Sequence, residues 1–305
     1  MKTLQNRLYE GFYKNAGGIA CHPTTKRELQ SEIRIRLERG QTNLNDIDTS
    51  RVTDMSSLFQ FFNNIQDIDI SGWDVSKVKD MNNMFLDCRK FNCDLSKWDV
   101  SSVEDMSSMF FNCKNFNSDL SKWDVSNVTG MGGMFVDCAK FSSDLSKWNV
   151  SKVRDMSSMF NGCTNFNSDL SKWNVGSVEN MSQMFKGCIK FNSDLSKWDV
   201  GEVIFMSYMF SNCYEFNSDL SKWDVGNVTR MNSMFNDCES LDFDPSKWNI
   251  KKVINMSFMF YGCKNFSIDY LNWDVKPSQY TRGMLYDSSI KDINQTFVDY
   301  EITKD

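Results

Sequence analysis

The sequence is poor in the residues that break a fold or assemble a metal site. Its 305 residues include only three prolines and one histidine, His22, and no low-complexity segment. The scarcity of proline and the lack of linker-like sequence favour continuous folded structure over disorder. A single histidine and the absence of a C-x-x-C motif argue against a zinc site.

Long apolar runs and basic clusters are also missing. Gln, Asn, Arg and Glu interrupt the first 18 residues, where a secretory signal needs an unbroken apolar segment. We therefore predict no signal peptide and no membrane span, and expect a cytoplasmic location or export by a non-classical route. The formal charge of −6, without a compensating basic patch, argues against nucleic acid as a partner.

What the sequence has in abundance is repetition. Tryptophan occurs nine times, each 25 residues after the last, from Trp73 to Trp273. Columns of Phe, Met, Val and Cys keep the same step. A period of this length is typical of a stacked solenoid, so we predict nine 25-residue coils over residues 52–277.

Each coil is predicted to pair two different arms. In the coil 103–127, six apolar residues are spaced three, three, one, three and three: Val103, Met106, Met109, Phe110, Cys113 and Phe116. This spacing predicts a short helical or 3₁₀ arm. Trp123 and Val125 then alternate with polar residues and predict a short strand. The expected fold is an α/β repeat solenoid, similar to a leucine-rich-repeat stack, whose coils share a core and a backbone hydrogen-bond ladder.

Both ends of the stack should be covered, because open solenoid ends expose unpaired edges. Helical spacing at Leu29, Ile33 and Leu37, with a threonine before it and Gly40 after it, predicts an amphipathic helix. We assign residues 1–51 to an N-terminal helical cap. The repeat pattern is lost after Pro277, so residues 278–305 are assigned to a C-terminal cap.

The repeat, written V-x-x-M-x-x-M-F-x-x-C-x-x-F-N-x-D-L-S-x-W-D-V-S, resembles that of the BspA-like leucine-rich repeat surface proteins. The repeats of that bacterial group were catalogued as a domain of unknown function in mycoplasmas and other bacteria. The Val, Met, Met-Phe, Cys and Phe columns are also similar to the Treponema-type leucine-rich repeat. The resemblance covers residues 52–277. It implies a horseshoe or rod-like solenoid and, for many relatives, a place on the cell surface with a role in adhesion or host-protein binding.

Two columns have both a structural and a functional interpretation. Eight of the ten cysteines, Cys88 to Cys263, form one inward column, for which reduced core thiols are favoured over disulfides. Cys21 and Cys93 lie outside it and are the candidates for separate chemistry. The tryptophan column is either a wall of the core or an aromatic platform for sugars, and its regularity favours the wall.

An aspartate column has two interpretations as well. Its carboxylates could accept backbone N–H groups at turns while a neighbouring lysine column balances their charge. They could instead share calcium ions along the stack. The calcium candidates are Asp94, Asp119, Asp144, Asp169, Asp194 and Asp219.

Catalysis is not expected from this sequence. It needs a few unlike groups converging on one point, whereas a ladder repeats the same group at every level. Gly130, Gly132 and Gly133 lack the strand-then-helix setting and the lysine of a phosphate-binding loop. We therefore predict a non-enzymatic chain without a cofactor.

The framework columns are broken late in the chain by large apolar residues. They are Ile204, Phe205, Tyr208, Tyr214, Ile254, Phe258 and Tyr261. We predict that they form an exposed patch that binds a protein or a glycan. Two alternatives remain open. The residues could pack against the C-terminal cap, which has Met284, Leu285, Ile293 and Phe297, or the protein could be a structural element that self-associates.

Overall fold

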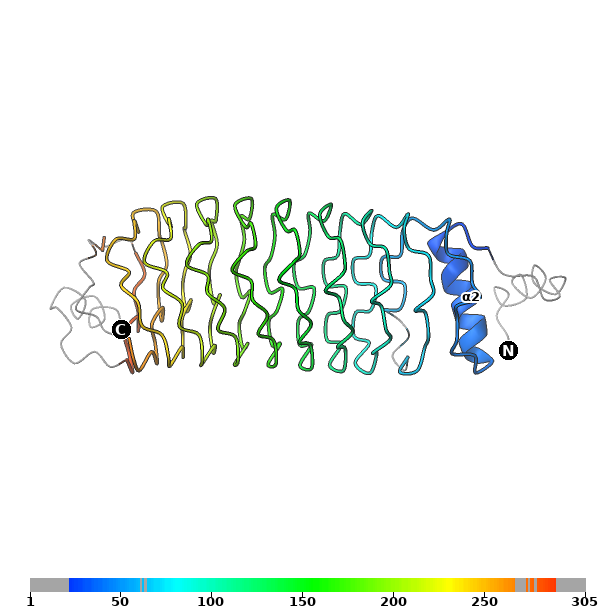
Figure 1. The fold of residues 1–305 in the computed structure, drawn as a ribbon. Coiled ribbons are helices and arrows are strands. Elements are labelled where there is room, and N and C mark those ends of the chain that lie inside the picture. Colours follow the sequence, from blue (N-terminus) through cyan, green and yellow to red (C-terminus); the bar gives the residue numbers. More distant parts are fainter. Residues whose placement is uncertain are drawn as a thin grey trace.

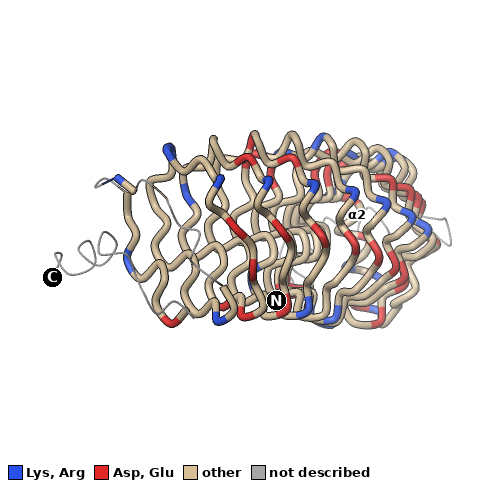
Figure 2. The backbone as a smooth tube through the Cα atoms, turned by 60° about the vertical axis from the view of Figure 1, so that its left-hand side comes forward, with Lys and Arg blue, Asp and Glu red and all other residues tan. Residues whose placement is uncertain are grey.

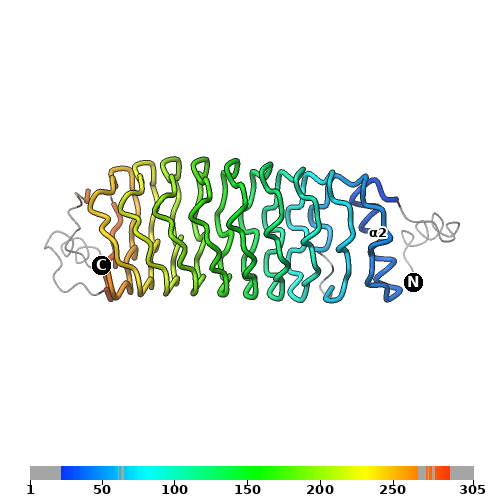
Figure 3. Tube along the Cα trace, in the orientation of Figure 1, coloured from blue at the N-terminus to red at the C-terminus, as the bar shows by residue number. Residues whose placement is uncertain are grey.

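The computed structural model describes residues 22–60, 62, 65–266, 273, 275, 276 and 279–288. They form one elongated stack of coils, with helix α2 at one end and residues 279–288 at the other (Figure 1). The tube trace shows the coils following one another along a single axis (Figure 3). Helix α2 spans Lys26–Glu38 and is the one regular helix in this part of the chain. The stack is therefore a repeat solenoid, as predicted.

The arm predicted as helical is a run of turns. In the arm at residues 81–88, the N–H groups of alternate residues from 81 to 87 donate to carbonyls of residues 105–111 in the next coil, all at 2.9 Å. The N–H groups of residues 84, 86 and 88 instead close turns three residues back, at 3.0–3.2 Å. Neighbouring coils also meet in single-residue parallel bridges, such as Asp80 with Asp105. The described coils thus contain neither the predicted helix nor an extended strand.

Left-handed backbone explains why this arm is not a helix. Positive φ angles recur at the column that begins with Ser57 and Asn83 and, from Asp87 onward, at a second column four residues later. From Asp87 onward, the second column holds only Asp, Asn and Gly: Asp87, Asn112, Asp137, Gly162, Gly187, Asn212, Asp237, Gly262 and Asp287. These residue types tolerate the left-handed region best. A left-handed residue every four positions stops a right-handed helix, so the apolar spacing reflects successive turns.

Aromatic ladders fill the core along the length of the stack. Successive rings in the Phe85 to Phe260 column lie 5.5–5.7 Å apart. All nine tryptophans are buried, with 3–8% of each exposed. Each indole Nε1 donates to a main-chain carbonyl of the preceding coil, as Trp173 does to Leu145 at 2.9 Å. The tryptophan column is a core wall, and its rings are not available as a sugar platform.

The cysteine column is also structural. From Cys113 to Cys263, each Sγ donates to a phenylalanine carbonyl of the preceding coil at 2.9–3.1 Å. The described cysteines are free thiols, and burial raises the pKa of Cys88 to about 12 and also raises those of the later cysteines in the column. Cys93 is buried as well, and it accepts the Ile70 N–H at 3.5 Å where later coils use a serine hydroxyl. Cys21 lies outside the described residues.

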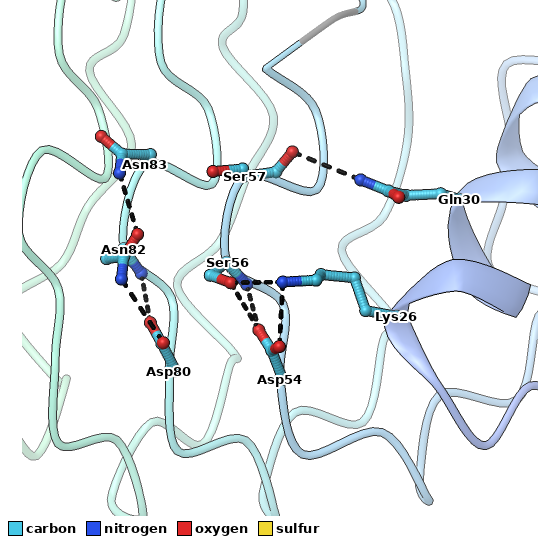
Figure 4. Close-up of polar contacts among 8 residues, drawn as sticks. All are labelled: Lys26, Gln30, Asp54, Ser56, Ser57, Asp80, Asn82 and Asn83. Atoms are coloured by element: carbon cyan, nitrogen blue, oxygen red, sulfur yellow. Dashed lines mark hydrogen bonds and ion pairs between the residues drawn. The ribbon is translucent and has the colours of Figure 1, made fainter.

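Helix α2 covers the N-terminal end of the stack. Thr25 caps it through a capping box with Glu28, and Leu29 and Ile33 are fully buried against the first coil. On its polar side, Lys26 Nζ lies 2.9 Å from Asp54 Oδ2 and donates to the Ser56 hydroxyl (Figure 4). The described helix is too short and polar to cross a membrane.

The repeat register extends beyond the limits read from the sequence at both ends. Asn43 pairs with Asp69, so a coil begins nine residues before position 52. At the other end Tyr280 pairs with Asn255, and Met284 and Leu285 are buried in the stack. Residues 279–288 therefore supply a further arm. Ile293 and Phe297 of the predicted C-terminal cap lie outside the described residues.

Candidate functional site

One long side of the stack is formed by equivalent eight-residue arms. We call the outward side chains of these arms the arm face. The arms are 53–60, 79–86, 104–111, 129–136, 154–161, 179–186, 204–211, 229–236, 254–261 and 279–286. In the arm 204–211, Met206, Met209 and Phe210 are fully buried and Ser211 is 2% exposed. The outer surface is formed by Ile204, Phe205, Ser207 and Tyr208.

The exposed large hydrophobic residues of the described chain all lie in its last third. They are Phe205, Tyr208, Tyr214, Ile254, Phe258, Tyr280 and Tyr286, with 37–66% of each exposed. Six of the seven belong to the arm face, and Tyr214 lies on the turn that follows the arm 204–211. We call these residues, with Ile204 and Tyr261, the aromatic patch. Ile204 and Tyr261 are partly exposed.

Tyr280 and Tyr286 were missed by sequence reasoning, although the signal was present. They lie 25 residues after Asn255 and Tyr261 and so occupy repeat columns beyond Pro277. Tyr286 stacks on Tyr261 with ring centroids 5.6 Å apart. Extending the 25-residue count through the proline would have placed both tyrosines on the patch.

Two rings of the patch stand on strained backbone. Tyr208 has φ 59° and Phe258 has φ 57°, in a column that otherwise holds Ser, Asn, Gly and Gln. A left-handed conformation costs an L-residue with a large side chain about 1–2 kcal/mol. Strain of this kind often marks functional positions. The two aromatic residues therefore stand where the turn itself favours small polar residues.

Phe205 also replaces a residue that stabilises the turn. In most arms the second residue is Asp or Asn, and its Oδ1 accepts the N–H two residues later, as Asp155 does from Ser157 at 2.8 Å. A phenylalanine side chain has no acceptor to offer the N–H of Ser207. The arm 204–211 thus loses a local hydrogen bond and exposes a ring, two changes that do not favour folding.

The patch continues across the polar arm 229–236. A Cβ added to Gly283 would lie 2.5 Å from Cε1 of Phe258, so the Phe258 ring lies over the next coil. Tyr208 precedes Ser233 in the same column, and Ser233 is only 6% exposed. We attribute this burial to the tyrosine ring lying over it in the same way.

Cations border the patch. The guanidinium of Arg230 lies 5.8 Å from the centroid of the Phe205 ring, and Lys186 Nζ lies 5.2 Å from that of Tyr208. Cation–π contacts of this kind hold a charged group against an aromatic face. The patch therefore presents positive charge beside apolar surface.

The aspartates considered for calcium lie in turns of the other arm. In each, Oδ1 accepts the N–H of the serine two residues later, at 2.9–3.0 Å. For Asp119, the backbone N–H of Ser121 and then its hydroxyl lower the pKa of the carboxyl group. The described residues contain no group of three or more His, Cys, Asp or Glu side chains arranged to hold a metal. This geometry supports the turn interpretation.

Comparisons with known proteins identify a repeat family without an assigned activity. A family model described as "Mycoplasma protein of unknown function, DUF285" matches residues 31–148, 130–227 and 193–300. No curated protein matches. Among solved structures, the leucine-rich repeat domain of APL1B is 9% identical with a TM-score of 0.21, over 92% of this chain and 98% of that one.

Proposed function

The chain belongs to the DUF285 family, and from its repeats we propose that it is a non-enzymatic scaffold that binds a protein partner through the aromatic patch. The observation that carries the proposal is the placement of Tyr208 and Phe258. Both rings are 38% exposed on left-handed backbone. Residues that cost stability and solubility are retained where they contribute to binding.

The composition of the patch supports a protein partner over a glycan. Tyrosine, phenylalanine and arginine are enriched where protein interfaces concentrate their binding energy. Successive arms lie roughly 5 Å apart, so the rings of the arms 204–211, 254–261 and 279–286 span several such steps. A surface of that extent suits an extended segment or a helix of another protein.

The finer proposal concerns biological role. The similarity of the repeat to the BspA-like surface proteins supports adhesion to a host protein. The rival interpretation, self-association, uses the same patch with a second copy of the chain as the partner. Self-association predicts that the molecular mass of the purified protein rises with its concentration, whereas adhesion to another protein predicts a constant mass.

A peptide-display selection tests the proposal. The wild-type chain, the triple variant Phe205→Ser/Tyr208→Ser/Phe258→Ser and the control Phe111→Ser serve as bait for a random peptide library. Phe111 is a half-buried ring of the arm 104–111, outside the patch. We expect peptides that enrich on the wild type and the control but not on the triple variant.

The outcome is interpretable because folding is measured in parallel by circular dichroism and thermal unfolding. If the triple variant unfolds, the pair Tyr208→Asn/Phe258→Asn replaces it, since Asn83 occupies the same column. Equal enrichment on the patch variant would refute the proposal. A mass that rises with concentration in the wild type and not in the variant would favour self-association, and binding to a glycan array alone would favour a sugar ligand.

A further inference from the structure

The charge of the arm face changes along the stack. The first six arms carry six acidic residues, Asp54, Asp80, Glu104, Asp105, Asp155 and Glu179, and three basic ones, Lys79, Arg154 and Lys186. The last four arms carry no acidic residue and two arginines, Arg230 and Arg282. In Figure 2, uncharged tube predominates in the coils nearest the C-terminal end.

The basic residues of the acidic region and those of the patch have different environments. Lys79 lies 3.0 Å from Glu104, and Arg154 lies 2.8 Å from Glu179, so these cations are paired between neighbouring coils. No carboxylate of the described residues lies within ion-pair distance of Lys186, Arg230 or Arg282. Two of these three are instead placed over aromatic rings.

We propose that the partner presents an acidic and apolar segment, in which aliphatic or aromatic side chains cover the patch and carboxylates pair with Arg230, Lys186 and Arg282. The inference rests on the proposed function and specifies its partner. An arginine held against a ring keeps its outer N–H groups free, and its planar fork can bind a carboxylate through two hydrogen bonds. Covering the patch with apolar groups would strengthen those charged contacts by excluding water.

The acidic half of the arm face gives the interaction a direction. Carboxylates at Asp54, Asp80 and Asp105 lie in one bridged column, and burial together with its two acidic neighbours raises the pKa of Asp80. An acidic segment would be repelled there and attracted near Arg230. Like-charge repulsion of this kind selects the position of a partner more than it adds affinity. The segment is therefore confined to the arms from 204 to 286 and to Lys186 at their border.

Two synthetic peptides of about 12 residues test the charge requirement directly. They share the same leucine, phenylalanine and tyrosine residues and differ only in having four glutamates or four lysines. Fluorescence anisotropy gives the Kd of each for the wild type, for Arg230→Glu and for the control Lys222→Glu, an exposed residue on the other arm. We expect the glutamate peptide to bind the wild type and the control at least about ten-fold more tightly than the lysine peptide does. This ratio corresponds to about 1.4 kcal/mol of binding free energy.

Arg230→Glu should reverse the preference for the glutamate peptide, and 0.5 M salt should reduce that preference. If Arg230 served only the fold, neither change would alter which peptide binds more tightly. A lysine peptide that binds the wild type as tightly, or an Arg230→Glu variant with unchanged preference, would overturn the inference. If the lysine peptide binds as tightly as the glutamate peptide and its binding needs Phe205 and Tyr208, the proposed function stands without its acidic partner. If no peptide depends on the patch, both proposals fail.

Discussion

Tyr208 and Phe258 show at the scale of single residues how the turn geometry and the surface conflict. Their column requires left-handed backbone in every coil, and the common solution is Ser, Asn or Gly. A ring at such a position gains little from burial because more than a third of it remains exposed. The backbone strain is therefore offset by the rest of the stack rather than by local packing.

Replacing either ring by asparagine should consequently stabilise the protein. We expect Tyr208→Asn and Phe258→Asn each to raise the free energy of unfolding by about 0.5–1 kcal/mol, because asparagine tolerates the left-handed region. Urea unfolding checks this. The reciprocal control Ser158→Tyr puts a tyrosine at the same column of an unpatched arm, where φ is 55°, and should destabilise by about 1 kcal/mol. A loss of stability in both asparagine variants would show that the rings serve the fold.

Much of the core could be predicted from the residues that recur in each column. The turn conformation of the eight-residue arms could not. Trp173 and Cys163 were expected to be buried because tryptophan and cysteine recur at a fixed 25-residue step, and both are buried. The spacing of Met106, Met109 and Cys113 was interpreted as helical, since periodic apolar residues are the usual sign of a helix. The competing signal was the restriction of the Asp87 column to Asp, Asn and Gly, which indicates a left-handed turn in each coil.

At the scale of the element, the turns of the other arm make stability depend on pH. The backbone N–H groups and hydroxyls of the serines two residues later lower the pKa of six carboxyl groups in the fold: Asp94, Asp119, Asp144, Asp169, Asp194 and Asp219. A carboxyl group with a lowered folded pKa stabilises the fold above its unfolded pKa of about 3.9 and loses that contribution as pH falls through the folded pKa. Burial raises the pKa of Asp80 and Asp237, which acts in the opposite sense but concerns only these two of the described aspartates.

We therefore expect the midpoint of thermal unfolding to be nearly constant from about pH 7 to 5 and to fall below about pH 4. The triple variant Asp119→Asn/Asp144→Asn/Asp169→Asn keeps an Oδ1 acceptor in each turn but removes the titration. Its unfolding midpoint should fall less steeply with acidification. A pH dependence as steep as that of the wild type would mean that other groups control it.

The same triple variant separates turn chemistry from calcium binding. Because each Oδ1 already accepts a backbone N–H, we expect millimolar calcium, followed by a chelator, to leave the unfolding midpoint of the wild type unchanged. A ligand that binds only the folded state would raise that midpoint. A rise of many degrees with calcium, lost in the asparagine variant, would restore the calcium interpretation of this column.

At the scale of the whole molecule, the strict period determines which changes in length the stack can tolerate. Each coil contacts its neighbours through identical columns, so the stability of a solenoid is approximately a sum of coil and interface contributions. The ends of the stack were harder to predict than its period. At the N-terminal end, Ile47 stands where later coils have tryptophan. At the C-terminal end, Tyr280 comes after Pro277, where the repeat pattern is lost from the sequence. Both end coils therefore differ from the repeat that defines the rest.

Deleting one complete coil should leave a folded protein. Removing residues 153–177 joins Lys152 to Val178 and returns every later residue to its own column. The arm 179–186 then still donates to the carbonyls of 204–211. It replaces the arm 154–161 as the acceptor for the N–H groups of 129–136. We expect cooperative thermal unfolding with a midpoint lower by a few degrees, because one interface and one coil of buried core are lost. As a control, deleting only residues 153–164 removes fewer residues but places the tryptophan-containing arm of one coil against the eight-residue arm of its neighbour. That shorter deletion should abolish cooperative unfolding, since mismatched arms cannot form the alternating N–H ladder; if it folds as well as the full-coil deletion, register between coils does not determine the fold.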